Sequence, residues 1–175
     1  MMSSCNSEPR FPFLLLSPPK SHLMSQPQYY LAQLNIAFMK GESSEDPIMA
    51  DFVANIGRII AIAESDPAFV WRLVDEGSDP TNPFTDPRML ANLSVWQSID
   101  ALKQFVYKSD HVNIMRRKKE WFHLMEAMHM VLWYVPAGHI PTLAEAKERL
   151  ELLRSNGPTA DAFHFGKVFE MPVVG

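Results

Sequence analysis

The segment LANLSVWQSIDALKQFVYKSDHVNIMRRKKEWF, from Leu90 to Phe122, is the most informative about the fold. Side chains alternate from Met89 to Trp96, which predicts a β-strand with successive residues on opposite faces. One face is apolar, whereas the other carries an amide, a hydroxyl and an indole beside one leucine (Leu90, Asn92, Ser94 and Trp96). A mixed face of this kind is typical of a surface that meets water, an interface or a ligand.

Two helices are predicted directly after this strand. Ser98 fits the N-cap of the first helix, with Asp100 in its first turn, and Ser109 offers a second N-cap. The second helix is expected from Asp110 to about Phe122. Helical spacing places a mixed set of side chains along one stripe of it, namely His111, Met115 and Lys118 with Lys119.

Outward from this stretch, the chain adds three strands and two helices in a regular order. The strands are predicted over 29–37, 68–75 and 128–135, and the helices over 47–64 and 142–156. The resulting order is β-α-β-β-α-β followed by an extra helix. This is the ferredoxin-like order of the α+β class, in which helices cover one face of an antiparallel sheet.

The second face of this sheet is partly apolar and needs a cover. Such a face commonly pairs with that of a second copy, and two copies can close a barrel, so we expect a homodimer, a dimeric α+β barrel. The alternative is a monomer in which the C-terminal tail covers the face with its aromatic residues Phe163, Phe165 and Phe169.

Composition excludes several classes of protein. Hydrophobic residues make up 47% of the chain, enough for a packed core, and the net charge of −4 gives no general basic field for nucleic acid. The run Arg116–Lys119 is the local exception, interpreted as a solvated helix face with a phosphate site as the alternative. No apolar run approaches the ~20 residues of a membrane-spanning helix. The single cysteine, Cys5, is compatible with a reducing cytoplasm.

The first 28 residues differ from the rest. They hold prolines at 9, 12, 18, 19 and 27, and we predict a disordered N-terminal extension over 1–28, with Met24 as a candidate true start. The domain is expected over 29–165, followed by a short tail over 166–175.

Several segments of the chain together resemble a known family. They are LAQLNIA, SDPAFVWRL, NLSVW, FVY-x-S, EWF and VPAGH-x-PT, in order between Tyr29 and Phe165. The chain resembles the bacterial family called domain of unknown function 3291, grouped with the dimeric α+β barrels and the antibiotic-biosynthesis monooxygenases. The resemblance implies a dimer with pockets between sheet and helices, and it implies no established activity.

The wider superfamily includes haem-degrading monooxygenases, which use an asparagine, a tryptophan and a histidine. Asn35 matches the first of these positions, whereas Phe105 and Met115 stand at the other two. His111 lies one turn before Met115 on the same stripe. Because two of the three residues differ, no cofactor is predicted, and a haem-binding protein is the less favoured alternative. Two histidines and a glutamate lie close together at 123, 126 and 129, but a loop fixes no geometry, and no metal site is predicted either.

His111 is the candidate catalytic residue, because a histidine at a helix start facing a pocket can act as a general base. The alternative is a capping histidine. Arg72 is a candidate for holding a carboxylate or enol oxygen, with an ion pair across the dimer as the alternative. Asn35 and Asn92 are candidates for orienting a ligand, with a polar pair on adjoining strands as the alternative.

Aromatic residues supply the remaining candidates. Trp71, Trp96 and Trp133 are predicted to line a ligand cavity, with core or interface packing as the alternative. His139, in the turn after the last predicted strand, is placed at a pocket mouth or, alternatively, stabilises that turn.

Two functions follow. The first is an enzyme, either monooxygenase-like or isomerase-like, acting on a small apolar carbonyl compound. The second is a non-catalytic ligand-binding or structural dimer.

Overall fold

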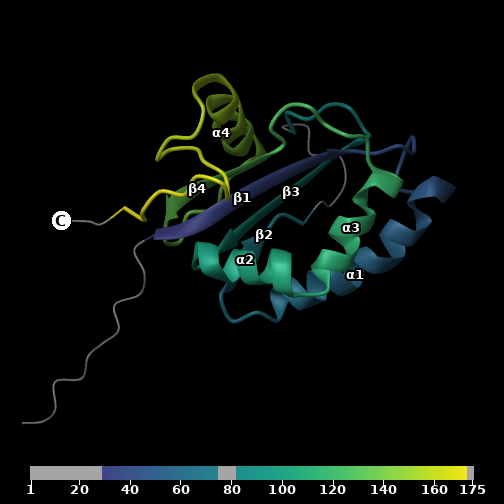
Figure 1. The fold of residues 1–175 in the computed structure, drawn as a ribbon, viewed down its shortest axis with the longest axis horizontal. Coiled ribbons are helices and arrows are strands. Elements are labelled where there is room, and N and C mark those ends of the chain that lie inside the picture. The colour runs from purple at the N-terminus through teal and green to yellow at the C-terminus, as the bar shows by residue number, and fades with distance from the viewer. Residues whose placement is uncertain (1–28, 75–81, 173–175) are drawn as a thin grey trace, which may run out of the picture.

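In the computed structural model, residues 29–74 and 82–172 are described, and they form one antiparallel sheet in the order β2-β3-β1-β4 (Figure 1). The strands are β1 (Tyr29–Phe38), β2 (Phe69–Arg72), β3 (Met89–Trp96) and β4 (Met130–Pro136). β1 and β3 pair along eight residues, from Leu31 opposite Trp96 to Phe38 opposite Met89. The ferredoxin-like order and the α+β class are confirmed. The extension predicted over 1–28 lies outside the described residues.

Three helices cover one face of the sheet, and their starts follow the capping pattern of the sequence. They are α1 (Ala50–Glu64), α2 (Ile99–Lys108) and α3 (His111–Trp121), with a short 3-10 turn, η1 (Pro47–Met49), before α1. The Ser98 hydroxyl accepts from Ala101 N at 3.2 Å and so caps α2. The Asp46 carboxylate accepts from Ile48 N at 3.0 Å, so it caps the 3-10 turn, and α1 itself begins only at Ala50.

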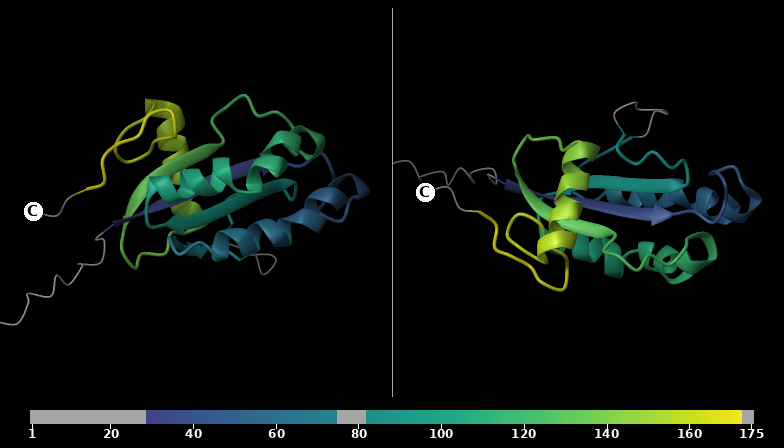
Figure 2. Two further views of the ribbon diagram at one scale, coloured as in Figure 1. Left: turned by 60° about the horizontal axis from the view of Figure 1, so that its bottom comes forward. Right: turned by 90° about the horizontal axis from the view of Figure 1, so that it is seen from above.

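The expectation that the other face is bare is wrong, because α4 (Leu143–Asn156) lies across it (Figures 1 and 2). Its inward stripe is at most 8% exposed and packs on the apolar side chains of β1 and β4; the stripe consists of Leu143, Ala146, Leu150 and Leu153. Burying each leucine stabilises the chain by about 1.5–3 kcal/mol, so the extra helix occupies this face within one chain.

The C-terminal tail lies along the edge of the sheet, not across its open face. Phe163 exchanges two 2.8 Å backbone hydrogen bonds with Leu132 of β4 and is fully buried. The Tyr134 hydroxyl donates to the carbonyl oxygen of Phe169 at 2.9 Å. The tail aromatics therefore pack beside α2, and they shield the edge that β4 would otherwise expose.

A β-bulge corrects the expected faces of β2. Phe69 pairs with Trp96 and Trp71 pairs with Val95, so Val70 is the extra residue. Phe69 therefore faces the α1–α2 side, whereas Trp71 and Leu73 face the α4 side. Strict alternation would place Phe69, Trp71 and Leu73 on one face, and it fails at this one position.

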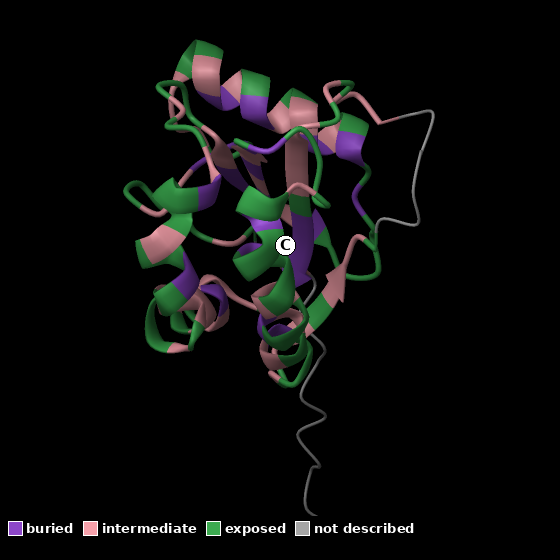
Figure 3. Cartoon of the chain, turned by 90° about the vertical axis from the view of Figure 1, so that its right-hand side faces the viewer, coloured by how far each residue is buried: buried purple, intermediate pink, exposed green. Residues whose placement is uncertain are grey.

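Burial follows these layers (Figure 3): the middle of β1, the second half of β3, most of β4 and the inward sides of the helices are buried, whereas β2 and the outer sides of the helices are half-buried or exposed. Across residues 29–74 and 82–172, no helix combines the length and the apolar character that a membrane crossing requires.

Candidate functional site

Four polar side chains lie in two cross-strand pairs on the sheet face that α1, α2 and α3 cover. Gln33 is opposite Ser94, and Asn35 is opposite Asn92. Gln33 and Ser94 are 7% and 5% exposed, whereas Asn35 is half-buried and Asn92 is exposed. These pairs form a polar ladder that starts in the interior at Gln33 and Ser94 and reaches solvent at Asn92.

The inner end of the polar ladder is held by a chain of buried hydrogen bonds. The Ser94 hydroxyl donates to Gln33 Oε1 at 2.9 Å and accepts from Trp96 Nε1 at 3.1 Å. A hydroxyl is both donor and acceptor, so one oxygen satisfies two buried partners. These two hydrogen bonds fix the Gln33 amide and the Trp96 indole in single orientations.

Aromatic rings continue from this chain to His111. Trp96 is stacked on Phe105 of α2, with ring centroids 5.1 Å apart and planes at 29°. The Phe105 ring is in turn 4.9 Å from the His111 ring. The polar ladder, the aromatic rings and the imidazole therefore form one contiguous set of contacts between the sheet, α2 and α3.

His111 is held at the first position of α3 by the loop before it. The Ser109 hydroxyl accepts from His111 N at 3.1 Å, and His111 Nδ1 lies 3.4 Å from the carbonyl oxygen of Val106. Burial lowers the pKa of the imidazole from its usual value, and the Val106 carbonyl opposes this only partly. A hydrogen on Nδ1 would donate to that carbonyl, leaving Nε2 of a neutral ring as a proton acceptor.

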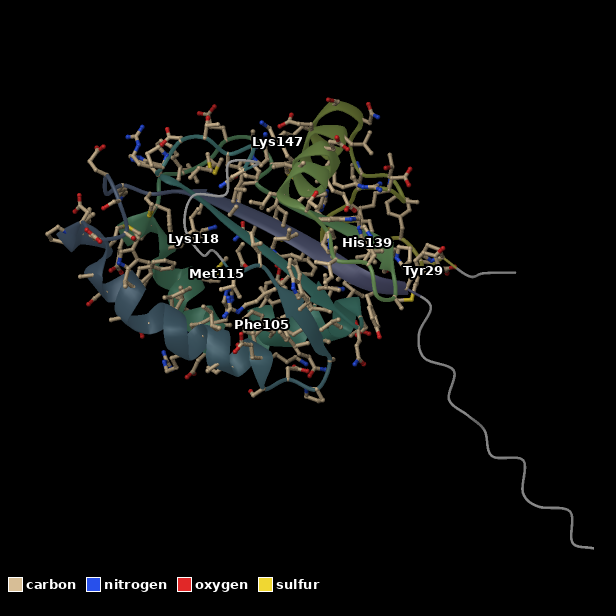
Figure 4. All side chains as sticks on the ribbon, turned by 180° about the vertical axis from the view of Figure 1, so that it is seen from behind. Tyr29, Phe105, Met115, Lys118, His139 and Lys147 are labelled. Carbon is tan, nitrogen blue, oxygen red and sulfur yellow. The ribbon has the colours of Figure 1, made fainter. Side chains whose placement is uncertain are left out.

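Further along α3, Met115 and Lys118 follow His111 on one stripe. Met115 is 36% exposed and Lys118 is exposed. In Figure 4, the labelled Phe105, Met115 and Lys118 follow one another through the space between the sheet and α1. The flank of α3 that begins at His111 therefore carries an apolar side chain, Met115, and then a cation, Lys118.

A shallow hollow of about 220 Å³ opens on the outer side of Phe105. Its lining comes from the ends of α1 and α2 and consists of Ile62, Asp66, Gln104, Phe105, Lys108 and Ser109. Phe105 is thus a wall shared between this hollow and the rings of Trp96 and His111.

The structure separates the sequence-predicted ligand residues into two groups. His111, Asn35, Asn92 and Trp96 lie together between the sheet and its three helices, as described above. Trp71 and Trp133 lie on the opposite face, beneath or beside α4.

Arg72 faces the helix side but is already paired. Its Nε is 2.7 Å from Glu64 Oε1 at the end of α1, and its Nη1 donates to Leu73 O at 3.3 Å. It thus lies in an ion pair within one chain.

His139 and Trp133 share one partner, Glu145 of α4. Trp133 Nε1 donates to Glu145 Oε1 at 3.0 Å, and His139 Nε2 lies 2.7 Å from Glu145 Oε2. Glu145 N donates to the Thr142 hydroxyl at 3.1 Å, as the capping pattern predicts. In this structure the VPAGH-x-PT segment joins α4 to β4.

Three residues of the site were not predicted from the sequence, namely Gln33, Ser94 and Phe105. A signal existed for two of them: Ser94 is on the mixed face of its strand, and Gln33 shares a face with Asn35. Phe105 carried no such signal, because a phenylalanine at helical spacing predicts only core packing.

The side chains near His111 do not match a haem site. Met115 and Phe105 stand where the resemblance places a histidine and a tryptophan, and the Phe105 ring is packed against both Trp96 and His111. Among the residues whose placement is described, no group of three or more His, Cys, Asp or Glu side chains is arranged to hold a metal ion.

Comparison with known proteins gives a family and several similar folds. The model of the family described as "Domain of unknown function (DUF3291)" matches residues 30–174. No curated protein matches the chain. A solved structure, SO0527 from Shewanella oneidensis, is similar with 11% identity, 62% of this chain and 91% of that chain covered, and a TM-score of 0.44.

Two further structures give similar values. NE2512, a protein of unknown function from Nitrosomonas europaea, is 12% identical with 66% and 97% coverage and a TM-score of 0.43. SnoaB, a cofactor-independent oxygenase from Streptomyces nogalater, is 15% identical with 63% and 95% coverage and a TM-score of 0.42.

Proposed function

The chain belongs to the DUF3291 family, and from its site we propose that it binds a small apolar carbonyl compound and removes a proton from it. The observation that carries the proposal is His111, a histidine with a lowered pKa whose ring lies against Phe105 at the inner end of a polar ladder. A neutral imidazole at pH 7 is the form that accepts a proton, and such a general base typically contributes 10²–10⁴-fold to rate.

The proposed step balances within the site. The C–H bond next to the carbonyl breaks, its proton moves to His111 Nε2, and its electron pair forms an enolate whose charge rests on the carbonyl oxygen. The amide N–H group of Gln33, at the inner end of the polar ladder on the side of His111, is the donor proposed for that oxygen, and Asn35 and Asn92 lie further out along the ladder. Phe105 and Met115 supply the apolar contact for the rest of the molecule.

Two outcomes follow from the same enolate. Return of the proton to a different carbon gives an isomerisation, and capture of the enolate by O₂ gives an oxygenation that needs no bound cofactor. The two outcomes share the proton transfer, so a test of that transfer tests both.

Hydrogen–deuterium exchange is the direct test. 2-Tetralone, an enolisable apolar ketone, is incubated with the full-length chain in D₂O, and loss of its C1 proton signal is followed by NMR. We expect the wild type to accelerate exchange and His111→Gln to remove about 10²-fold or more of that acceleration. His129→Gln is the matched control, because His129 lies just before β4 and takes no part in the described contacts of His111.

Exchange that is equal in wild type and His111→Gln would contradict the base assignment. Ketone binding without any exchange would assign the chain to the non-catalytic alternative, a ligand-binding protein.

We also propose that two chains associate, as the family resemblance implies. Because α4 covers the second face of the sheet, the contact would not be made by two bare sheets.

A further inference from the structure

The four consecutive basic residues of α3 face two different surfaces. Arg117 faces α1, where its Nη2 is 2.8 Å from Asp51 Oδ2 and 2.7 Å from Glu120 Oε2. These carboxylates raise the pKa of the guanidinium further above its usual value. The next residue is turned by about 100° around the helix axis, so Lys118 lies on the other flank of α3, with Met115 and His111.

The two flanks differ in charge. The α1 flank neutralises its cation with two carboxylates, whereas no carboxylate within the described ranges lies within 4 Å of the Lys118 ammonium. The polar ladder opposite this flank consists of neutral amides and a hydroxyl. On the flank of α3 that carries His111 and Met115, Lys118 is therefore a cation without an ion-pair partner among the described residues.

We propose that Lys118 binds the anionic end of the ligand, so that the substrate class is an apolar carboxylate whose acidic C–H or O–H group lies at its opposite end. This inference rests on the proposed function, because His111 marks that opposite end. Seven residues separate the two positions on the helix, a rise of about 10 Å along its axis. Met115, between them, offers a polarisable thioether to the body of the molecule.

The length and charge of this stripe define the ligand. A body of two fused rings with substituents at its two ends is long enough to reach from the imidazole toward the ammonium. A Lys ammonium attracts a carboxylate as a point charge, so it contributes affinity and orientation together. Orientation is the more important consequence, because it places the acidic proton of the ligand at His111 Nε2.

Two probes distinguish the contribution of the ligand's carboxylate to binding from that of its ring system. 6-Hydroxy-2-naphthoate carries a phenol at one end and a carboxylate at the other, and 2-naphthol lacks the carboxylate. Binding to the full-length chain is measured from the fluorescence of each naphthol. We expect about tenfold tighter binding of the naphthoate at low salt, since one charge-assisted contact has that order of effect. The preference should shrink in 0.5 M salt because added ions screen an exposed charge.

The variants are Lys118→Gln and Lys119→Gln. We expect Lys118→Gln to abolish the preference for the naphthoate and to leave the affinity for 2-naphthol unchanged. Lys119→Gln is the matched control: it has the same charge change one residue along, and the contact that Lys119 makes with Lys40 uses only its backbone carbonyl. Lys119→Gln should keep the preference.

The outcomes show whether the role of Lys118 fails alone or together with the proposed function. A preference that survives in Lys118→Gln, or falls equally in both variants, overturns the role of Lys118. Binding of 2-naphthol that depends on His111, with no gain from the carboxylate, overturns this inference and leaves the proposed function standing. Failure of both probes to bind at millimolar concentration overturns both.

Discussion

Replacing Glu145 by alanine tests how α4 is held over the sheet. One carboxylate accepts from the Trp133 indole at 3.0 Å and lies 2.7 Å from His139 Nε2. Trp133 is fully buried, so its N–H loses its only acceptor in the described part of the chain. A buried donor left unpaired costs about 1–3 kcal/mol. His139 is 44% exposed and contributes at most about 1 kcal/mol.

We therefore expect Glu145→Ala to lower the free energy of unfolding by about 2–3 kcal/mol. In a chain of this size that is a fall of about 5–10 °C in Tm. Glu145→Gln keeps an oxygen for the indole and should lose less. Glu148→Ala is the matched control, since Glu148 is exposed one turn along α4.

Urea unfolding followed by tryptophan fluorescence measures these differences. The midpoint should fall for Glu145→Ala with an unchanged slope, because the surface exposed on unfolding stays the same. A Glu145→Ala midpoint equal to that of Glu148→Ala would show that the Glu145 contacts do not stabilise the chain and that apolar burial alone holds α4.

Four further predictions follow from other contacts. Ser94→Ala should destabilise the protein by about 2–4 kcal/mol, because it leaves Gln33 Oε1 and Trp96 Nε1 buried without their partner. Urea unfolding measures this loss, and a value below ~0.5 kcal/mol would contradict the buried hydrogen bonds of Ser94. His111 has a lowered folded pKa, so the unfolded state binds the proton more tightly, and stability should fall as pH drops below about 6.5. His111→Gln should flatten that part of the pH–stability curve, and an unchanged curve would count against the assignment. Phe163→Ala should cost about 3–5 kcal/mol in thermal or urea unfolding, since the ring is fully buried beside α2. Light scattering after gel filtration should give the mass of two chains, and a single-chain mass would end the dimer proposal.

Much of the fold could be predicted because its signals are local. The alternation from Met89 to Trp96, the caps at Ser98 and Thr142 and the apolar stripe of α4 depend only on residues a few positions apart. The bulge at Val70 could not be predicted, because it depends on how β2 pairs with β3 and not on its own sequence.

The candidate site could be predicted only in part, for a related reason. A histidine at the start of a helix and amides on a strand are visible in the sequence, and the structure brings His111 and Asn35 to the same side of the sheet. Trp133 and His139 carried the same kind of signal but lie with α4 on the other side. Side-chain type shows what a residue can do, whereas the face it occupies decides which partners it meets.

The strands, the helices, their order and the polar character of one sheet face could be read from local sequence, since each depends on short-range periodicity and capping. The three-dimensional packing was needed to show that α4 covers the second face, that Glu145 joins it to Trp133, and that the rings of Trp96, Phe105 and His111 are in contact. Those contacts join residues far apart along the chain, and they are fixed by which apolar surfaces bury one another, a choice that no local pattern encodes.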